Sequence, residues 1–390
     1  MITVSQAVEK INQVTSALNK IQVSVSKGLN KVLAEAVHSP IYMPPFNQSA
    51  MDGYALGDIT SKTYQLIGEV KAGDNPEGLS LSKGQAVRIF TGGFVPKGTI
   101  TVAQQEIVER SGNTIHLKTS IIENKNIRPK GEQIIEGQLA LEKGTLITPA
   151  TIGFLYGIGI DKISIYSSPK VAIIATGSEL VSPGQKLTPG QIYESNSFAL
   201  KAAIETLGVE ASIISVKDNY EITRDAIKEA VENNDLVLTS GGISVGDYDF
   251  VGDAFQEIGV QEHFYKVQQK PGKPLFFGQK NDTSVFGLPG NPASALSCFY
   301  VYVMPTIKKM MGHTGSFDER ENATLTGSYT RKGSFTHFLK AHIKNNKVTV
   351  LNAQSSAMLS SFAAANCLAC FPGEQENWNA GDSIQVIRID

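Results

Sequence analysis

The chain has 390 residues, a net charge of −2 at pH 7 and 41% hydrophobic residues. One hydrophobic core rarely serves a chain of this length, so we expect about two to four domains. The small net charge and the lack of a basic cluster exclude the electrostatic signature of a nucleic-acid-binding protein.

The N-terminal region begins with a helical pattern. Apolar residues recur at helical spacing from Val4 to Leu18, behind a candidate cap at Ser5, and predict an amphipathic helix. A second helix is expected at about 26–37. From 64 to 147, short β-forming runs alternate with turns and predict a small β domain. We therefore place a composite N-terminal region at 1–168, with a β domain inserted at about 45–146.

From residue 168 the pattern changes to alternating strands and helices. Strands are expected at 170–175, 209–216, 236–239 and 284–288, and helices at 197–207, 223–233, 250–258 and 292–311. This alternation is typical of a doubly wound, mostly parallel α/β sheet, which we place at 169–313. The remaining 314–390 is β-rich, with strands expected at 323–329, 338–344, 347–351 and 383–389, and predicts a β-barrel or sandwich.

The environment of the protein can be judged from its apolar and cysteine residues. The first 40 residues contain charges such as Glu9 and Lys10, so they do not resemble a signal peptide, and the most apolar run, 293–305, is too short to span a bilayer. Three cysteines, Cys298, Cys367 and Cys370, cannot form a disulfide framework. The C-x-x-C pair at 367–370 lacks two further zinc ligands, and we interpret it as small buried residues. We expect a soluble, cytoplasmic protein without a membrane or nucleic-acid partner.

Ligands of an open α/β sheet bind at the carboxyl ends of its strands, and four unusual loops follow the predicted strands. Three of these loops carry carboxylates, Glu179, Asp218 and Asp249. Magnesium typically takes one or two carboxylates and completes its shell with water and phosphate oxygens. We therefore predict a Mg2+ and phosphate site there, although each carboxylate alone could be a helix cap or a solvated charge.

The third and fourth loops also carry glycines and small polar residues. The third, SGGISVGDYD, offers backbone amides as a phosphate cradle, but it lacks the lysine and hydroxyl of a Walker A loop. The alternative, that these glycines only form a tight turn, stays open. The candidate ligand-binding residues of the two loops are Ser240, Gly241, Gly242, Ser244, Pro289 and Asn291.

Three lysines lie in the irregular segment YKVQQKPGKP, just before a probable strand. Lys266, Lys270 and Lys273 are separated by three or four residues, with Pro and Gly between the last two. Such a segment can direct cations toward an anion, although lysines are more often solvated. In the N-terminal half, SAMDGYA and TGGFVPKG contain Asp52, Thr91 and Gly92, but by themselves they indicate turns as readily as binding loops.

In these motifs the chain resembles the molybdopterin molybdenumtransferase family, whose eukaryotic relative is the C-terminal part of gephyrin. The matching motifs occur in the family's order across nearly the whole chain: PPFNQSAMDGYA, TGGFVPKG, TGSEL, GQIYESN, TSGGISVGDYDF, KPGKPL and GLPGNPASAL. The resemblance implies a homodimer with an N-terminal helical region, an inserted β domain, a molybdopterin-binding α/β domain and a C-terminal β-barrel. It also implies a site shared between subunits.

The resemblance further assigns roles to residues. It implies that Glu179, Asp218, Asp249, Lys266 and Lys270 line the pterin-phosphate and metal site, and that Asp52 and Thr91 reach this site from the other subunit. The implied reaction inserts molybdenum from molybdate into adenylylated molybdopterin, with Mg2+-dependent hydrolysis and AMP release. An adenylyltransferase and the acceptor molybdoenzymes are the implied protein partners.

Three positions depart from the family pattern, and two other functions stay open. Ile100 stands where many members have an acidic residue, Ser334 lies where an Arg is common, and Asn47 replaces a frequent Asp. One alternative is a molybdopterin adenylyltransferase, although such enzymes resemble the central domain alone. The other is a non-catalytic scaffold that binds a partner peptide, as the gephyrin relative does.

Overall fold

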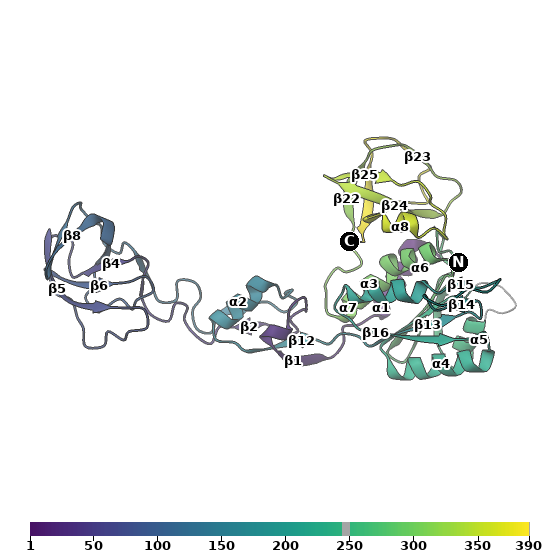
Figure 1. Ribbon diagram of the computed structural model, residues 1–390, viewed down its shortest axis with the longest axis horizontal. Coiled ribbons are helices and arrows are strands. Elements are labelled where there is room, and N and C mark those ends of the chain that lie inside the picture. Colours follow the sequence, from purple (N-terminus) through teal and green to yellow (C-terminus); the bar gives the residue numbers. More distant parts are fainter. Residues whose placement is uncertain (244–249, 390) are drawn as a thin grey trace. The chain divides into compact units, whose positions relative to one another are not determined.

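The computed structural model describes residues 1–243 and 250–389. The chain forms two compact units, each with buried cores of its own (Figure 1). The first unit contains Met1–Ile21, Asn30–Ala34 and Ser164–Asp390, and the second contains Gln22–Leu29 and Glu35–Ile163. No helix of the described residues combines the length and the apolar character that crossing a membrane requires.

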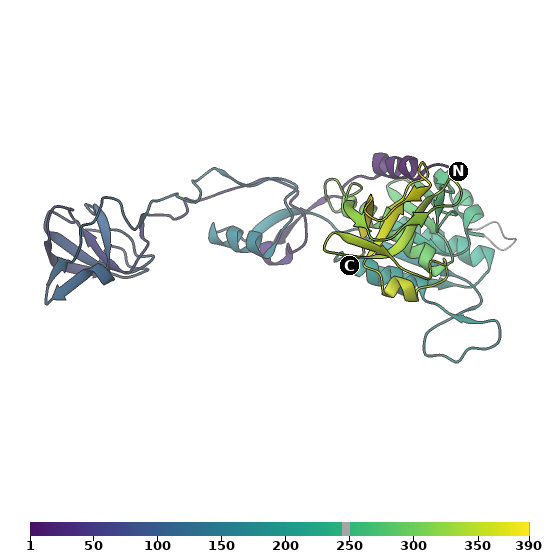
Figure 2. The ribbon, with the colours of Figure 1, turned by 90° about the horizontal axis from the view of Figure 1, so that it is seen from above.

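The second unit contains a six-stranded sheet, coloured purple to blue in Figure 2. All neighbouring strands in it are antiparallel except β5 and β6. Alternate side chains of the strands enter two separate cores, as Ala55 and Leu56 do on β4. The predicted β domain is thereby confirmed. The strand order is β7 (Thr101–Gln104), β4 (Gly53–Leu56), β6 (Gln85–Ile89), β5 (Thr63–Val70), β9 (Thr114–Leu117) and β8 (Val108–Ser111).

The remainder of the N-terminal region consists of short elements. Helix α2 (Pro149–Gly157) is capped by the Thr148 side chain. Three two-stranded pairings accompany it: β1 (Lys20–Ser24) with β12 (Lys162–Tyr166), β2 (Val37–His38) with β11 (Leu139–Leu141), and β3 (Gln48–Ser49) with β10 (Ile127–Arg128).

The prediction of a second helix at about 26–37 is wrong. A single 3-10 turn, η1 (Val25–Lys27), ends at Gly28. Asn30 then adopts a φ of 61°, a left-handed conformation that an α-helix cannot contain. The chain therefore leaves the helical conformation despite the apolar residues that follow.

The N-terminal helix packs in the first unit. Helix α1 (Val4–Val14) begins one residue after Thr3, whose hydroxyl accepts a hydrogen bond from the Gln6 amide, so Thr3 is the cap instead of Ser5. Its buried residues Val4, Ala7 and Ile11 belong to the core of the central sheet. The helix ends at Val14, four residues earlier than Leu18.

The central sheet has six strands (Figure 1). Its first four strands are parallel and confirm the predicted doubly wound arrangement. The last two are antiparallel: β18 was not predicted, whereas β20 forms where a strand was expected after the lysine segment. Asn281 and Asp282 form the tight turn that joins β20 to β21. The order is β16 (Ala211–Val216), β13 (Val171–Thr176), β17 (Leu236–Ser240), β21 (Thr283–Leu288), β20 (Phe276–Lys280) and β18 (Gln261–Tyr265).

Helices cover both faces of this sheet. Helix α3 (Asn196–Glu205) packs with α1 in one core, whereas α4 (Tyr220–Asn233) and α5 (Phe250–Glu257) pack in another. The helix expected at 292–311 comprises α6 (Pro292–Cys298), a π-helical turn, η3 (Phe299–Val303), and α7 (Met304–Met310). Pro305 has no amide hydrogen to donate, which favours the wider turn just before it.

The C-terminal region forms a closed β-barrel, which decides between the two architectures expected from its sequence. The strands β24 (Thr336–Lys344), β25 (Lys347–Val350), β22 (Glu321–Leu325), β28 (Ser383–Arg388) and β26 (Cys367–Phe371) follow one another, and β26 pairs with β24 to close the ring. The short strand β19 (Gln269–Lys270) adds to the edge of β24. All three cysteines are buried, as expected, and none forms a disulfide within residues 1–243 and 250–389.

Candidate functional site

The carboxyl ends of the four parallel strands meet at one edge of the central sheet. A cavity of about 330 Å3 lies there, and we call it the strand-end cavity. Its lining draws on the loops that follow all four strands, so residues far apart in sequence face one space. Five of the predicted site residues line it: Glu179, Asp218, Gly241, Gly242 and Pro289.

The two described carboxylates of this cavity come from neighbouring loops. The Ser178 amide donates to Asp218 Oδ2 at 2.7 Å, and the Asp218 amide donates to Ser178 Oγ at 3.1 Å. These bonds tie the loop carrying Glu179 to the loop carrying Asp218. Within residues 1–243 and 250–389, no group of three His, Cys, Asp or Glu side chains is close enough to hold a metal ion. Asp249, the third predicted ligand, lies outside the described residues.

The glycine loop after β17 is closely packed. Gly241 and Gly242 have φ values of 93° and 65°, and a Cβ on Gly242 would lie 2.6 Å from a methyl of Val251. Positive φ and close packing both require glycine here. Such backbone turns expose amides that can bind phosphate oxygens. Ser244, also assigned to this loop from the sequence, lies outside the described residues.

Two polar residues that the sequence did not single out organise the neighbouring cavity. This cavity, of about 340 Å3, is lined by Glu179, Ser240 and Asn291 together with Glu194 and Asn196. The Asn196 amide donates to Ser240 Oγ at 2.9 Å and to the Gly290 carbonyl at 2.8 Å. Asn196 thus connects three loops. The motif GQIYESN contained both residues, but nothing in its pattern assigned a role to either.

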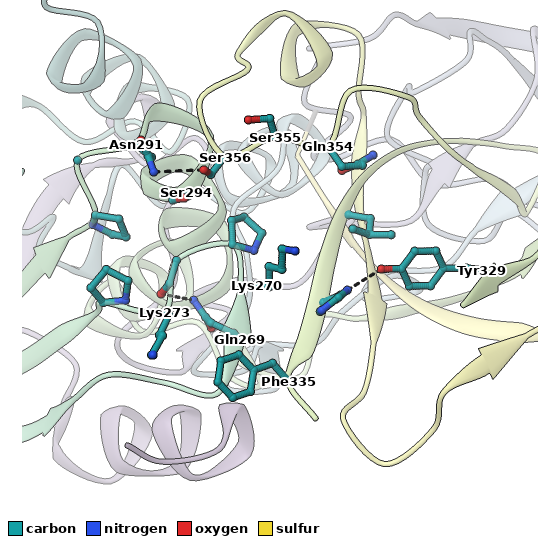
Figure 3. A pocket seen from close by; sticks show the side chains of 17 residues that line it. Gln269, Lys270, Lys273, Asn291, Ser294, Tyr329, Phe335, Gln354, Ser355 and Ser356 are labelled. Atoms are coloured by element: carbon teal, nitrogen blue, oxygen red, sulfur yellow. Dashed lines mark hydrogen bonds between the residues drawn. The ribbon is translucent and has the colours of Figure 1, made fainter. Parts of the chain in front are cut away.

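A larger cavity of about 930 Å3, which we call the lysine pocket, lies between the lysine segment and the barrel (Figure 3). Lys270 and Lys273 line it, together with Pro289 and Asn291 of the fourth loop. Pro274, Pro289 and Gly290 also line the strand-end cavity, so the two spaces are adjacent. Lys266 is not among the described residues that line these two cavities. Its Nζ lies 4.6 Å from the centre of the Tyr265 ring.

A buried glutamine holds the lysine segment in place. Gln269 is 1% exposed, and its Nε2 donates to the Gly272 carbonyl at 3.0 Å and to Cys298 Sγ at 3.3 Å (Figure 3). Its Oε1 accepts a hydrogen bond from the Tyr302 hydroxyl. A buried amide satisfied in this way fixes the backbone on which Lys270 and Lys273 stand.

The barrel supplies the opposite side of the lysine pocket with His337 and Tyr329, which the sequence did not indicate. His337 pairs in register with Lys270 in the β19–β24 ladder. Its Nδ1 lies 2.5 Å from the Tyr329 hydroxyl. Burial lowers the pKa of His337, and the positive charges of Lys270 and Arg331 lower it further.

In the second unit, the two motifs with candidate binding residues lie side by side. The Gly92 amide donates to the Ser49 carbonyl at 2.8 Å, and the Ser49 amide donates to the Gly93 carbonyl at 2.9 Å. Asp52 Oδ1 accepts hydrogen bonds from the backbone amide and the hydroxyl of Thr91, both at 2.8 Å. These bonds lower the pKa of Asp52, the amide having the larger effect. Asp52 therefore stays ionised.

Of the three departures from the family pattern, Asn47 has a structural role through its side chain, whereas the hydrogen bond of Ile100 uses only its backbone. In the second unit, Asn47 Oδ1 accepts a hydrogen bond from the Lys130 amide at 2.8 Å, and the Ile100 amide donates to the Leu56 carbonyl. Ser334 lies in the barrel next to Phe335, a residue of the lysine pocket.

Comparison with protein families gives matches over most of the chain. Residues 2–159 match the MoeA N-terminal region (domain I and II), residues 172–309 match a probable molybdopterin-binding domain, and residues 322–389 match the MoeA C-terminal region (domain IV).

Individual relatives cover the same length. The chain is 31% identical to the molybdopterin molybdenumtransferase of Staphylococcus aureus strain MSSA476, over 99% of this chain and 95% of that protein, and equally similar to that of Staphylococcus epidermidis. Among solved structures, the molybdopterin biosynthesis MoeA protein from Pyrococcus horikosii superimposes with a TM-score of 0.86 at 30% identity, covering 100% of this chain and 99% of that one.

Proposed function

The chain belongs to the molybdopterin molybdenumtransferase family, and from that premise we propose that it inserts molybdenum from molybdate into adenylylated molybdopterin. The observation that carries the proposal is the adjacency of two chemically different spaces. The strand-end cavity presents carboxylates and turned glycine backbone, whereas the lysine pocket presents cations, with no Asp or Glu among the described residues that line it. A substrate with a pyrophosphate link and a separate tetrahedral oxyanion would need both.

We assign the pyrophosphate to the strand-end cavity. The backbone of Gly241 and Gly242 would bind its oxygens, and Glu179 and Asp218 would hold Mg2+, with Asp249 as a further ligand. Two described carboxylates in one cavity fit a magnesium ion, since this ion needs one or two of them. When bound, Mg2+ supplies positive charge that stabilises the departing phosphate. Ser178 keeps Asp218 oriented toward Glu179's loop through their two hydrogen bonds.

We assign molybdate to the lysine pocket. Lys270 and Lys273 line this pocket and belong to no ion pair among the described residues, so their charges are available to an anion. On the family motif alone we also assign Lys266 to anion binding; its Nζ lies over the Tyr265 ring. In the reaction, water attacks the pyrophosphate link and AMP leaves. The two dithiolene sulfurs then bind the molybdenum of molybdate, while one molybdate oxygen leaves as water with the two thiol protons.

We further propose that the active enzyme is a homodimer whose site is shared, with Asp52, Thr91 and Gly92 reaching the pterin from the partner subunit. The second unit carries large apolar side chains that are 44–50% exposed, which suits a surface that a second copy covers. They include Ile135, Leu139, Leu146 and Tyr156. We expect cytoplasmic activity, with an adenylyltransferase as donor and molybdoenzymes as acceptors.

The two alternatives have less support. An adenylyltransferase would use the central domain alone, but the family matches extend to both the N-terminal and the C-terminal regions. A scaffold would not need the carboxylates of the strand-end cavity, yet Glu179 and Asp218 remain there.

The decisive experiment is anaerobic incubation of the protein with adenylylated molybdopterin and Mg2+, with and without molybdate. AMP release and pterin-bound molybdenum are measured for the wild type, for Asp218→Asn and for Glu210→Gln, an exposed carboxylate at the opposite end of the same strand. We expect molybdate-dependent product in the wild type and the control, and a loss on the order of 100-fold in Asp218→Asn. Release of pyrophosphate from a nucleotide would favour the adenylyltransferase. Tight pterin binding without either product would favour the scaffold.

A further inference from the structure

The lysine pocket has a polar group on its barrel side that the proposed reaction has not yet used. His337 is 6% exposed and lines the pocket beside Lys270, with which it shares a rung of the β19–β24 ladder. Paired residues in a parallel ladder project to the same face, so the imidazole and the ammonium face one space. Figure 3 shows Lys270 on the lysine segment and Tyr329 on the barrel, with the hydroxyl of Tyr329 directed toward the Lys270 side.

Tyr329 occupies one ring nitrogen of His337, Nδ1. Burial raises the pKa of the Tyr329 hydroxyl, so this group keeps its proton and can donate it to Nδ1 of His337. A neutral imidazole that accepts at Nδ1 carries its own proton on Nε2. With the Tyr329 hydroxyl as the donor to Nδ1, Nε2 carries the proton and is the nitrogen of His337 that can donate to a ligand.

The neighbouring polar side chains of the barrel form hydrogen bonds with backbone groups. Lys340 Nζ donates to the carbonyls of Ala353, Ser355 and Met358. The Gln354 side chain bonds the backbone of Lys340 and the Leu351 carbonyl.

Arg331 is similarly occupied, because its guanidinium donates to the carbonyls of Gly333, Gly373 and Gln375. These cations stabilise loops of the barrel. By contrast, no hydrogen bond to Nε2 of His337 is found among the described residues.

We propose that His337, oriented by Tyr329, is the barrel's donor to a tetrahedral oxyanion held by Lys270 and Lys273. The inference rests on the proposed function and adds a positioning and specificity residue to it. The bound oxyanion would then be attracted by the positive charges of the lysine segment and would accept a directed hydrogen bond from the barrel. Such a bond fixes the orientation of the oxyanion, which flexible ammonium groups alone do not do.

The affinity of the lysine pocket for an oxyanion should depend on pH through the pKa of His337. Lys270 and Arg331 face His337 from the neighbouring elements, and together with burial they keep the empty pocket's imidazole neutral near pH 7. An oxyanion compensates those charges and raises the pKa of His337 in the complex. Oxyanion affinity should therefore be highest below the pKa of the empty pocket and decrease as pH rises through the pKa of the complex.

Calorimetric titration with sulfate tests the proposal, since sulfate stays a dianion between about pH 5.5 and 8, where His titrates. We expect wild-type affinity to rise about three- to tenfold on acidification across this range. His337→Asn should bind about tenfold more weakly at the low end and lose this pH dependence. Tyr329→Phe should show a smaller loss. The matched control is His342→Asn, an exposed histidine on the same strand, which should behave as the wild type.

Two further measurements separate the possible outcomes. If Lys270→Met leaves sulfate and molybdate binding unchanged, the anion site of the proposed function is wrong. If binding depends on Lys270 but His337→Asn keeps the wild-type affinity and pH profile, only the role of His337 is overturned. The His337 imidazole signals in nuclear magnetic resonance spectra of the wild type give a test without any variant, because saturating sulfate should raise the pKa of His337. An unchanged pKa would also reject the role.

Discussion

Ser178 and Asp218 exchange two hydrogen bonds across the ends of neighbouring strands, each using its backbone amide and its side-chain oxygen. Because β13 and β16 are paired in register up to Thr176 and Val216, the two loops begin at the same level of the sheet. The exchange sets the distance between the loops that carry the two described carboxylates of the candidate site.

Replacing Ser178 should therefore affect activity more than stability. Ser178→Ala removes the acceptor of the Asp218 amide and should lower the rate of AMP release about three- to tenfold, in line with the loss of one hydrogen bond. The melting temperature should change little because this turn is exposed. Ser182→Ala, an exposed serine of the same segment, is the control. An unchanged rate in Ser178→Ala would show that the two loops hold their positions without it.

Gly272 should be irreplaceable for a steric reason. A Cβ on Gly272 would lie 2.5 Å from Cys298 Sγ, whereas a Cβ on Gly333 would meet no atom within 4 Å, although φ is positive at both (85° and 87°). Gly272→Ala should thus cost about 1–3 kcal/mol more than Gly333→Ala in unfolding free energy. Adding Cys298→Ala should recover part of that cost, measured as a coupling in a double-mutant cycle. Purely additive losses would contradict the steric explanation.

Asp58 should stabilise the β domain through its carboxylate. Burial alone would raise its pKa, but hydrogen bonds from the amides of Gly84, Ser61 and Thr60 outweigh this effect and lower the pKa of Asp58. The stabilisation is therefore complete above the unfolded pKa, about 4, and is lost as pH falls toward the folded pKa.

Replacing Asp58 tests the stabilisation by its carboxylate directly. Asp58→Asn should reduce the stability of the sheet by about 2 kcal/mol at neutral pH, and the difference from the wild type should shrink on acidification. Native-state hydrogen exchange of the β5 and β6 amides reports on this unit separately. The Asp74 carboxylate accepts one hydrogen bond, from the Lys71 amide, and the amide oxygen of Asn can still accept it, so Asp74→Asn should cost less than half as much. Equal losses in the two variants would refute the role of the clustered bonds.

Mixed dimers test the shared site. Asp52→Ala and Asp218→Ala should each abolish activity without unfolding the protein, because both side chains are exposed. If each site combines Asp52 of one subunit with Asp218 of the other, an equal mixture refolded together should regain about a quarter of wild-type activity, since half of the dimers carry one intact site. A mixture as inactive as its two components would contradict the shared site. Asp52 and Asp218 would then belong to the same subunit's site, or they would not act in one site at all.

The central domain was predictable because its strands are runs of buried apolar residues bounded by polar loops. The strand expected at 170–175 forms at Val171–Thr176, and that at 236–239 forms at Leu236–Ser240. The helix expected at 26–37 failed because apolar spacing does not reveal the backbone angles of Gly28 and Asn30. The strand β18 was missed because its short run, with polar residues at Gln261 and Glu262, resembles a loop, and the antiparallel pairing of β20 could not be read from its own residues.

The sequence by itself determined the order of the domains, the α/β class of the central sheet and the loops that carry Glu179, Asp218, Gly241 and Gly242. It could do so because each of these features depends on residues close together in the chain. Only the tertiary structure decided that β19 joins the barrel and brings Lys270 beside His337. That pairing depends on the register between distant segments, which no local pattern records, and the packing of Gln269 against Cys298 and Tyr302 holds it in place.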